Sequence, residues 1–110
     1  MVKKTSRSPG KSSEEAAADA SGGLSKTFPI LNELGLHARA AAQFVKIASR
    51  FSSEILVKKD SREVNGKSIM GILMLAAAKG SEIRITVSGG DASEALSALQ
   101  NLIENKFGEN

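Results

Sequence analysis

The chain has 110 residues, which is enough for one domain; 41% are hydrophobic, 4% are aromatic, and the formal net charge is +3. The absence of cysteine excludes a disulfide framework, a thiolate metal site and a cysteine nucleophile. With only one histidine a zinc site would also be hard to build, so we expect neither a metal nor a cofactor. Basic and acidic residues are interspersed and no strand carries an aromatic pair, so we expect no nucleic-acid binding. The longest apolar run, residues 69–78, is too short to cross a membrane, so we expect no membrane insertion.

Residues 1–24 are poor in large apolar side chains and rich in Ser, Ala, Gly and charge. This composition predicts a disordered N-terminal extension, followed by a folded domain over residues 25–110. Lys3 and Lys4 precede Ser, Pro and Gly instead of an apolar segment, so the extension does not resemble a signal peptide. An expression remnant, a mobile tether and an address all remain open as its role.

The first half of the domain predicts a strand followed by a helix. The strand spans Lys26–Leu31, with Phe28 and Ile30 on one face, and Pro29 within it indicates an edge or an irregularity. Helical spacing of apolar residues predicts a helix over residues 38–50. Its buried stripe consists of Ala41, Phe44, Val45, Ala48 and Phe51.

A hairpin and a short helix are predicted next. Residues 53–58 and 62–64 form the two strands of the hairpin, since Asp60-Ser61 between them is typical of a turn. Asn65-Gly66 ends the second strand, and a short helix over residues 68–76 follows. Lys79-Gly80 supplies a positive charge and a permissive glycine after this helix.

The last two elements show the clearest periodicities. Residues 82–88 alternate between apolar and polar side chains, which predicts a half-exposed strand. In the final helix we expect Asp91 as the cap with Glu94 three residues later, and a core stripe of Ala95, Leu96, Leu99, Leu102, Ile103 and Phe107. The order βαββαβα predicts an α+β fold, an open-faced sandwich in which three helices cover a four-stranded antiparallel sheet.

The only histidine, His37, follows Gly35 at the predicted start of the first helix. First-turn amides lack intrahelical partners and the helix dipole is positive there, so a phosphate on His37 would meet free donors. Imidazole is a competent nucleophile near neutral pH, and the Arg39 guanidinium suits phosphate oxygens. On geometry alone, a histidine that merely caps the helix and a solvated Arg39 remain an open alternative.

The segment Gly35-Leu36-His37-Ala38-Arg39 resembles the active-site motif of the histidine-containing phosphocarrier (HPr) family of the bacterial phosphoenolpyruvate-dependent sugar phosphotransferase system. The likeness continues in element order over residues 25–108. It implies that His37 is the phosphoryl acceptor and donor and that Arg39 stabilises the phosphate charge. The family usually has proline after the arginine, whereas this chain has Ala40, which we expect to loosen the first helical turn slightly.

A second segment, residues 65–71, resembles the family segment that contains a regulatory serine, which by position is Ser68. Its phosphorylation by a bifunctional HPr kinase/phosphorylase would add about −1.5 to −2 charges beside Ile69 and Met70. The alternative that Ser68 only caps the short helix is equally open. Phe44, Ile69 and Met70 are candidates for an apolar docking patch around the histidine, provided that they are exposed.

The resemblance implies a monomeric cytoplasmic phosphocarrier, a stoichiometric carrier and not an enzyme. It accepts a phosphoryl group from enzyme I and passes it to the A domain of enzyme II for sugar uptake. The alternative is a regulatory module on the same fold, which acts through phospho-Ser68 on a transcriptional regulator or in the nitrogen-related branch. A sheet that binds RNA in a salt-sensitive way is a third and weaker alternative.

Overall fold

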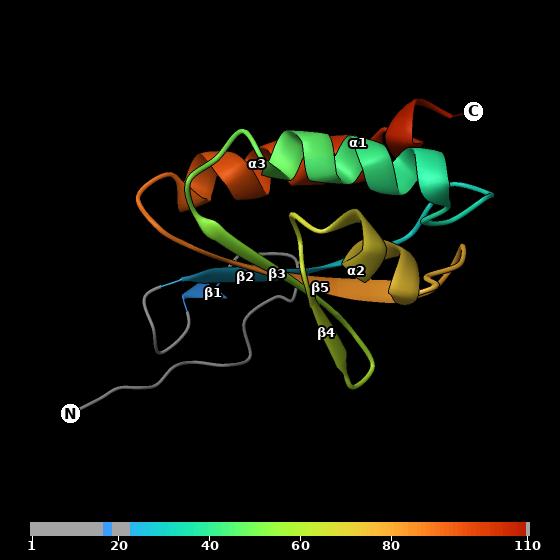
Figure 1. The fold of residues 1–110 in the computed structure, drawn as a ribbon, viewed down its shortest axis with the longest axis horizontal. Coiled ribbons are helices and arrows are strands. Elements are labelled where there is room, and N and C mark those ends of the chain that lie inside the picture. Colours follow the sequence, from blue (N-terminus) through green and yellow to red (C-terminus); the bar gives the residue numbers. More distant parts are fainter. Residues whose placement is uncertain (1–16, 19–22, 110) are drawn as a thin grey trace.

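The computed structural model describes residues 17–18 and 23–109. The elements in chain order are β1 (Ala17–Ala18), β2 (Leu24–Pro29), α1 (Ala38–Ala48), β3 (Glu54–Lys59), β4 (Arg62–Asn65), α2 (Ile69–Met74), β5 (Glu82–Ser88), α3 (Ala92–Glu104) and the 3-10 turn η2 (Lys106–Gly108). The sheet order is β1-β2-β5-β3-β4, and every neighbouring pair is antiparallel. All three α-helices lie on one face of this sheet (Figure 1). The predicted open-faced α+β sandwich is therefore confirmed.

The strand β1 is an addition to the four predicted strands. Ala17 pairs with Ser25 and Ala18 with Leu24, at the outer edge of β2. The rest of the predicted disordered extension, residues 1–16 and 19–22, lies outside the described residues. Pro29 is the last residue of β2, beyond the two residues that β1 covers, which is an edge position that proline tolerates.

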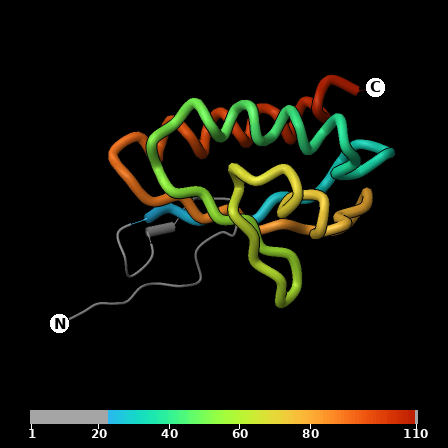
Figure 2. The backbone as a smooth tube through the Cα atoms, viewed as in Figure 1, coloured from blue at the N-terminus to red at the C-terminus, as the bar shows by residue number. Residues whose placement is uncertain are grey.

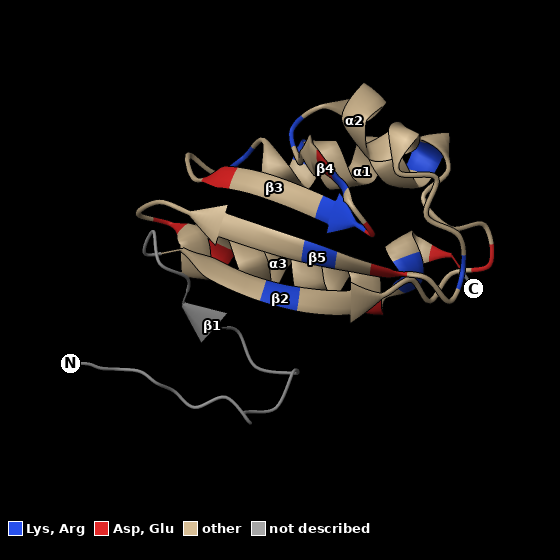
Figure 3. Ribbon diagram, turned by 90° about the horizontal axis from the view of Figure 1, so that it is seen from below, with Lys and Arg blue, Asp and Glu red and all other residues tan. Residues whose placement is uncertain are grey.

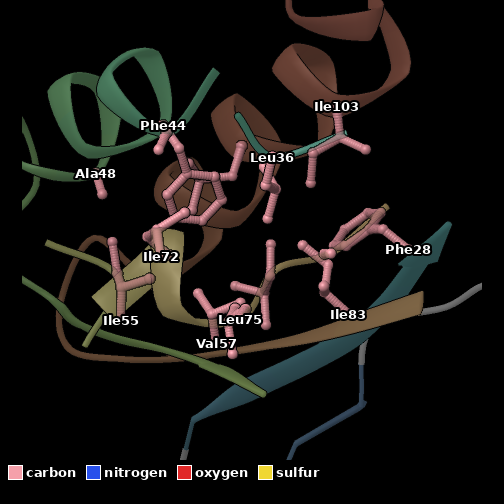
Figure 4. Packing of buried hydrophobic residues seen from close by; sticks show 14 of the residues in the cluster. Phe28, Leu36, Phe44, Ala48, Ile55, Val57, Ile72, Leu75, Ile83 and Ile103 are labelled. Carbon is pink, nitrogen blue, oxygen red and sulfur yellow. The ribbon is translucent and has the colours of Figure 1, made fainter. Parts of the chain in front are cut away.

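The core lies between the sheet and the helices (Figure 4). On β5 the alternation has the predicted result, because the side chains of Ile83, Ile85 and Val87 are fully buried. They lie in register with residues of β3, where Ile85 faces Val57 and Val87 faces Ile55. Four residues of α1 and five of α3 cover them: Ala40, Ala41, Phe44, Ala48, Ala92, Ala95, Leu96, Leu99 and Ile103.

The opposite face of the sheet is polar and open. Figure 3, which looks onto this face, shows both signs of charge spread over the strands. Arg84 and Thr86 of β5 both hydrogen-bond the hydroxyl of Ser25, at 2.9 and 2.8 Å. The described residues contain no helix that is long and apolar enough to cross a membrane.

The final helix ends earlier than its apolar pattern predicts. α3 stops at Glu104, and Lys106 and Phe107 adopt positive φ angles of 57° and 55°. Phe107 is nevertheless only 1% exposed, because the 3-10 turn η2 returns its ring to the core. The prediction that Phe107 is buried was correct, but its place in the helix was wrong.

The predicted N-cap residue of α3 was correct, but the expected side-chain capping hydrogen bond is absent. Asp91 occupies the N-cap position, but its carboxylate makes no capping hydrogen bond within the helix. It instead accepts from the backbone N–H groups of Ser52 and Ser53, at 2.9 and 3.0 Å, and from both serine hydroxyls. These donors favour the charged form, so they lower the pKa of Asp91 to about 2. Asp91 therefore fastens the α1–β3 loop to the start of α3.

We expect Asp91→Asn to lower the free energy of unfolding at neutral pH. The free energy of unfolding of this variant should also fall less steeply than that of the wild type as the pH is lowered. A carboxylate with a depressed folded-state pKa stabilises the fold above its unfolded pKa of about 3.9, and that contribution is lost as pH falls through about 2. Urea unfolding at pH 7 and between about pH 4 and 2 measures both effects. Glu94→Gln, an exposed change one turn away, is the control. Parallel pH curves for wild type and Asp91→Asn would contradict the assignment.

Candidate functional site

His37 lies at the N-cap of α1, as the sequence indicates. Its backbone is extended (φ −77°, ψ 179°), and its carbonyl accepts the N–H of Ala41 at 2.8 Å, the first bond of the helix. The ring atom Nδ1 accepts the first-turn N–H of Arg39 at 3.3 Å. This contact holds the ring, and because the side chain is 26% exposed, the ring remains accessible.

The loop before His37 is pressed against the segment that follows α2. The N–H of Leu36 donates to the carbonyl of Ala77 at 2.8 Å. Gly35 has a φ of +66°, and a Cβ there would clash with that same carbonyl oxygen and lie 2.9 Å from the Cα of Ala78. Only glycine meets both requirements, so Gly35 fixes how closely the histidine loop approaches the α2–β5 connection.

Two residues that sequence reasoning missed, Asn32 and Glu109, complete the surroundings of the histidine. One carboxylate oxygen of Glu109 pairs with Nε2 of His37, and the other accepts from Nδ2 of Asn32 at 3.1 Å. The same Nδ2 of Asn32 donates to the carbonyl of Gly35 at 2.8 Å, and Asn32 is fully buried. Figure 2 shows the end of the chain, in red, beside the start of α1.

The site combines one anionic and two basic groups. The hydrogen bonds from His37 and Asn32 lower the pKa of Glu109, and the charges of His37 and Arg39 act in the same direction. Glu109 is therefore a carboxylate at neutral pH. The Arg39 side chain is exposed at the first turn of α1, and among the described residues no acceptor holds its guanidinium. A negatively charged group near His37 would find this cation available.

Comparison of the chain with known protein families identifies the family that has this arrangement. A family model described as "PTS HPr component phosphorylation site" matches residues 24–105, which is most of the chain and includes the histidine loop. The chain belongs to the HPr family of the phosphotransferase system.

Relatives named phosphocarrier protein HPr cover the same region. The HPr of Neisseria meningitidis is 52% identical over 86 residues, which are 78% of this chain and 97% of the relative. The HPr of Treponema pallidum is 50% identical over 84 residues, which are 76% and 96% of the two chains. HPr is a phosphocarrier and not a catalyst, and it works within the phosphotransferase system.

Solved HPr structures share the fold. HPr from Thermoanaerobacter tengcongensis superimposes with a TM-score of 0.76 at 51% identity, over 78% of this chain and 97% of that one. HPr from Bacillus anthracis gives a TM-score of 0.71 at 47% identity, over 74% and 96% of the two chains.

The candidate HPr docking residues separate into two groups. Ile69 and Met70, on the first turn of α2, are 40% and 64% exposed, so they are available to a partner. Phe44 is fully buried, and its prediction as a docking residue was wrong. Phe44 belongs to the buried stripe of α1, so its ring points from the helix into the core, as Figure 4 shows.

Ser68 is the N-cap residue of α2. Its hydroxyl oxygen accepts the N–H of Gly71 at 3.0 Å, so the capping role that the sequence allowed is present. Ala40, which we expected to loosen the first turn of α1, is fully buried in that turn. Within the described residues, no group of three His, Asp or Glu side chains could hold a metal ion.

Proposed function

We propose that this chain is a cytoplasmic phosphocarrier that accepts a phosphoryl group on His37 from phosphorylated enzyme I and passes it to the A domain of enzyme II. The observation that carries the proposal is the position of His37 at the N-terminus of α1, with Nδ1 directed at a first-turn amide. Helix N-termini bind anions through free N–H groups and a positive dipole.

The contacts of the ring favour Nδ1 as the reacting atom. Because Nδ1 accepts the N–H of Arg39, it carries a lone pair and no proton, while Nε2 faces Glu109. The Nδ1 lone pair forms the new bond to phosphorus as the bond between phosphorus and the donor atom breaks. The phosphoryl oxygens then lie next to the first-turn amides, and the Arg39 guanidinium balances their charge.

Transfer in both directions requires transient docking, for which α2 is the proposed surface. Ile69 and Met70 expose apolar side chains on a helix whose C-terminal connection supports the histidine loop. Apolar side chains of this kind are common anchors of protein interfaces. We place enzyme I and the enzyme II A domain on this patch.

Ser68 is the proposed regulatory position, because it lies immediately before Ile69 and Met70. A phosphate on its hydroxyl would place about −1.5 to −2 charges at the edge of the docking patch and oppose docking by desolvation and repulsion. The modification would come from an HPr kinase/phosphorylase, and phospho-Ser68 could then be bound by a transcriptional regulator. This regulatory use of the domain is the second candidate function.

The decisive experiment is phosphorylation of the full chain by phosphoenolpyruvate and purified enzyme I. We expect label that is lost in acid, kept in alkali and absent from His37→Ala, because phosphohistidine is acid-labile. A wild-type chain that stays unlabelled while the same enzyme I phosphorylates another HPr would refute the carrier role and leave the Ser68-centred function.

A further inference from the structure

The Glu109 carboxylate is held on both of its oxygens by different donors. Nδ2 of Asn32 donates to Oε1 and Nε2 of His37 pairs with Oε2. Asn32 cannot reverse its amide, because Nδ2 also donates to the carbonyl of Gly35, a group that can only accept. One oxygen of Glu109 is therefore committed to Asn32, and only the other can face His37.

The position of Glu109 is itself fixed by the fold. Phe107, two residues earlier, is buried in the core, and the N–H of Glu109 donates to the carbonyl of Lys106 at 2.9 Å. The Glu109 side chain is only 19% exposed, although it lies close to the end of the chain. The carboxylate thus meets His37 from the residue that directly follows the 3-10 turn η2.

Both ring contacts select the same neutral form of His37. A neutral imidazole has one N–H and one lone pair. The N–H of Arg39 requires the lone pair on Nδ1, and the carboxylate of Glu109 requires the proton on Nε2. Resting on the function proposed above, we propose that Glu109 is a positioning residue that holds His37 as the Nε2–H tautomer and so presents the Nδ1 lone pair to the phosphoryl donor.

The same carboxylate meets the charge that develops during transfer. When the Nδ1 lone pair forms the bond to phosphorus, the electron pair of the breaking bond leaves with the donor, and the imidazole ring becomes positively charged with its proton still on Nε2. Glu109 faces that N–H, so no proton has to move. The charged groups near the ring are then Glu109, which faces Nε2, and Arg39, whose charge reaches Glu109.

An isosteric substitution of Glu109 separates its two contacts. In Glu109→Gln the single amide oxygen can serve Asn32 or His37, but not both. If it serves Asn32, an NH2 group faces Nε2 and favours the proton on Nδ1; if it serves His37, two NH2 groups face each other. A glutamine of the same size therefore cannot replace the carboxylate.

The test is 15N NMR of the His37 ring in the unphosphorylated full-length protein at alkaline pH, where imidazole is neutral. In the wild type we expect one ring nitrogen, Nε2, to be protonated and the other unprotonated, with widely separated shifts. In Glu109→Gln and Glu109→Ala the two shifts should converge, as both tautomers become populated. Glu104→Gln, which removes the same charge from a carboxylate that accepts from Gln100, should match the wild type.

The second measurement is the rate of phosphoryl transfer from phosphorylated enzyme I. We expect both Glu109 variants to be slower by about tenfold, by analogy with the lower range for carboxylates that orient metal-binding histidines. Wild-type shifts in Glu109→Gln, or converged shifts with an unchanged rate, would overturn the proposal. Failure of the proposed function is distinguishable, since it would leave the wild type unphosphorylated whatever the tautomer.

Discussion

Replacing Gly35 by alanine is expected to lower the free energy of unfolding by about 3 kcal/mol. About 1–2 kcal/mol comes from placing a Cβ at a φ of +66°. A further 1–3 kcal/mol is expected from steric overlap, because that Cβ would meet the Ala77 carbonyl and the Cα of Ala78, which are backbone atoms that cannot rotate away. The collision also displaces the acceptor of the Leu36 N–H, so phosphorylation of His37 should fall as well.

Gly80→Ala is the matched control for this effect. Gly80 also has a positive φ, +91°, but no atom outside its chain neighbours lies within 4 Å of the position that an alanine Cβ would take, so only the backbone strain of about 1–2 kcal/mol applies. Urea unfolding of both variants separates the two contributions. Equal losses of stability would show that the close approach of Gly35 to Ala77 does not matter.

Replacing Arg39 by alanine is expected to slow phosphoryl acquisition by roughly 100-fold, the lower range for removing one group that stabilises charge in a transition state. The guanidinium is exposed at the first turn of α1, and its charge already reaches the anionic partner of His37. Arg39→Lys should recover part of the rate, since it keeps the charge but not the planar pair of donors. Single-turnover transfer from phosphorylated enzyme I measures both variants.

Arg50→Ala provides the control for a general loss of positive charge. Arg50 is exposed just beyond the opposite end of the same helix, so its removal changes the net charge equally but lies far along α1 from His37. We expect its rate to stay within about twofold of the wild type, as for a screened surface charge. An Arg39→Ala rate equal to that of Arg50→Ala would remove Arg39 from the site.

Much of the fold could be predicted because the determining signals are local. The alternation of residues 82–88 needs no information beyond the strand, and the structure places β5 at the predicted bounds. Asp91 shows where such reasoning ends. Its spacing to Glu94 favours a cap, but Ser52 and Ser53, which lie 39 and 38 residues earlier, offer four donors and hold its carboxylate instead.

The site, like the fold, has a part that neighbouring residues predict and a part that depends on residues far apart in the chain. The position of His37 follows from a glycine and a helix start next to it in the chain, and it could be predicted. Its contact with Glu109 joins residues 72 positions apart, and no spacing or periodicity in the sequence indicates it. Phe44 illustrates a conflict of two predictions, because helical spacing assigned it to the core while it was also a candidate for the docking patch around His37. Its burial decides for the core.

The edge strands of the sheet determine how readily copies of this protein would aggregate by pairing strand to strand at high concentration. The outer strand β2 is covered by Ala17–Ala18 at one end and finishes at Pro29, which has no N–H to offer, at the other. The opposite border is β4, a strand of only four residues that begins with Arg62 and Glu63. Short, charged or proline-ended edges discourage strand-to-strand aggregation. A chain that begins after Ala18 would lack β1 and would leave that end of β2 uncovered.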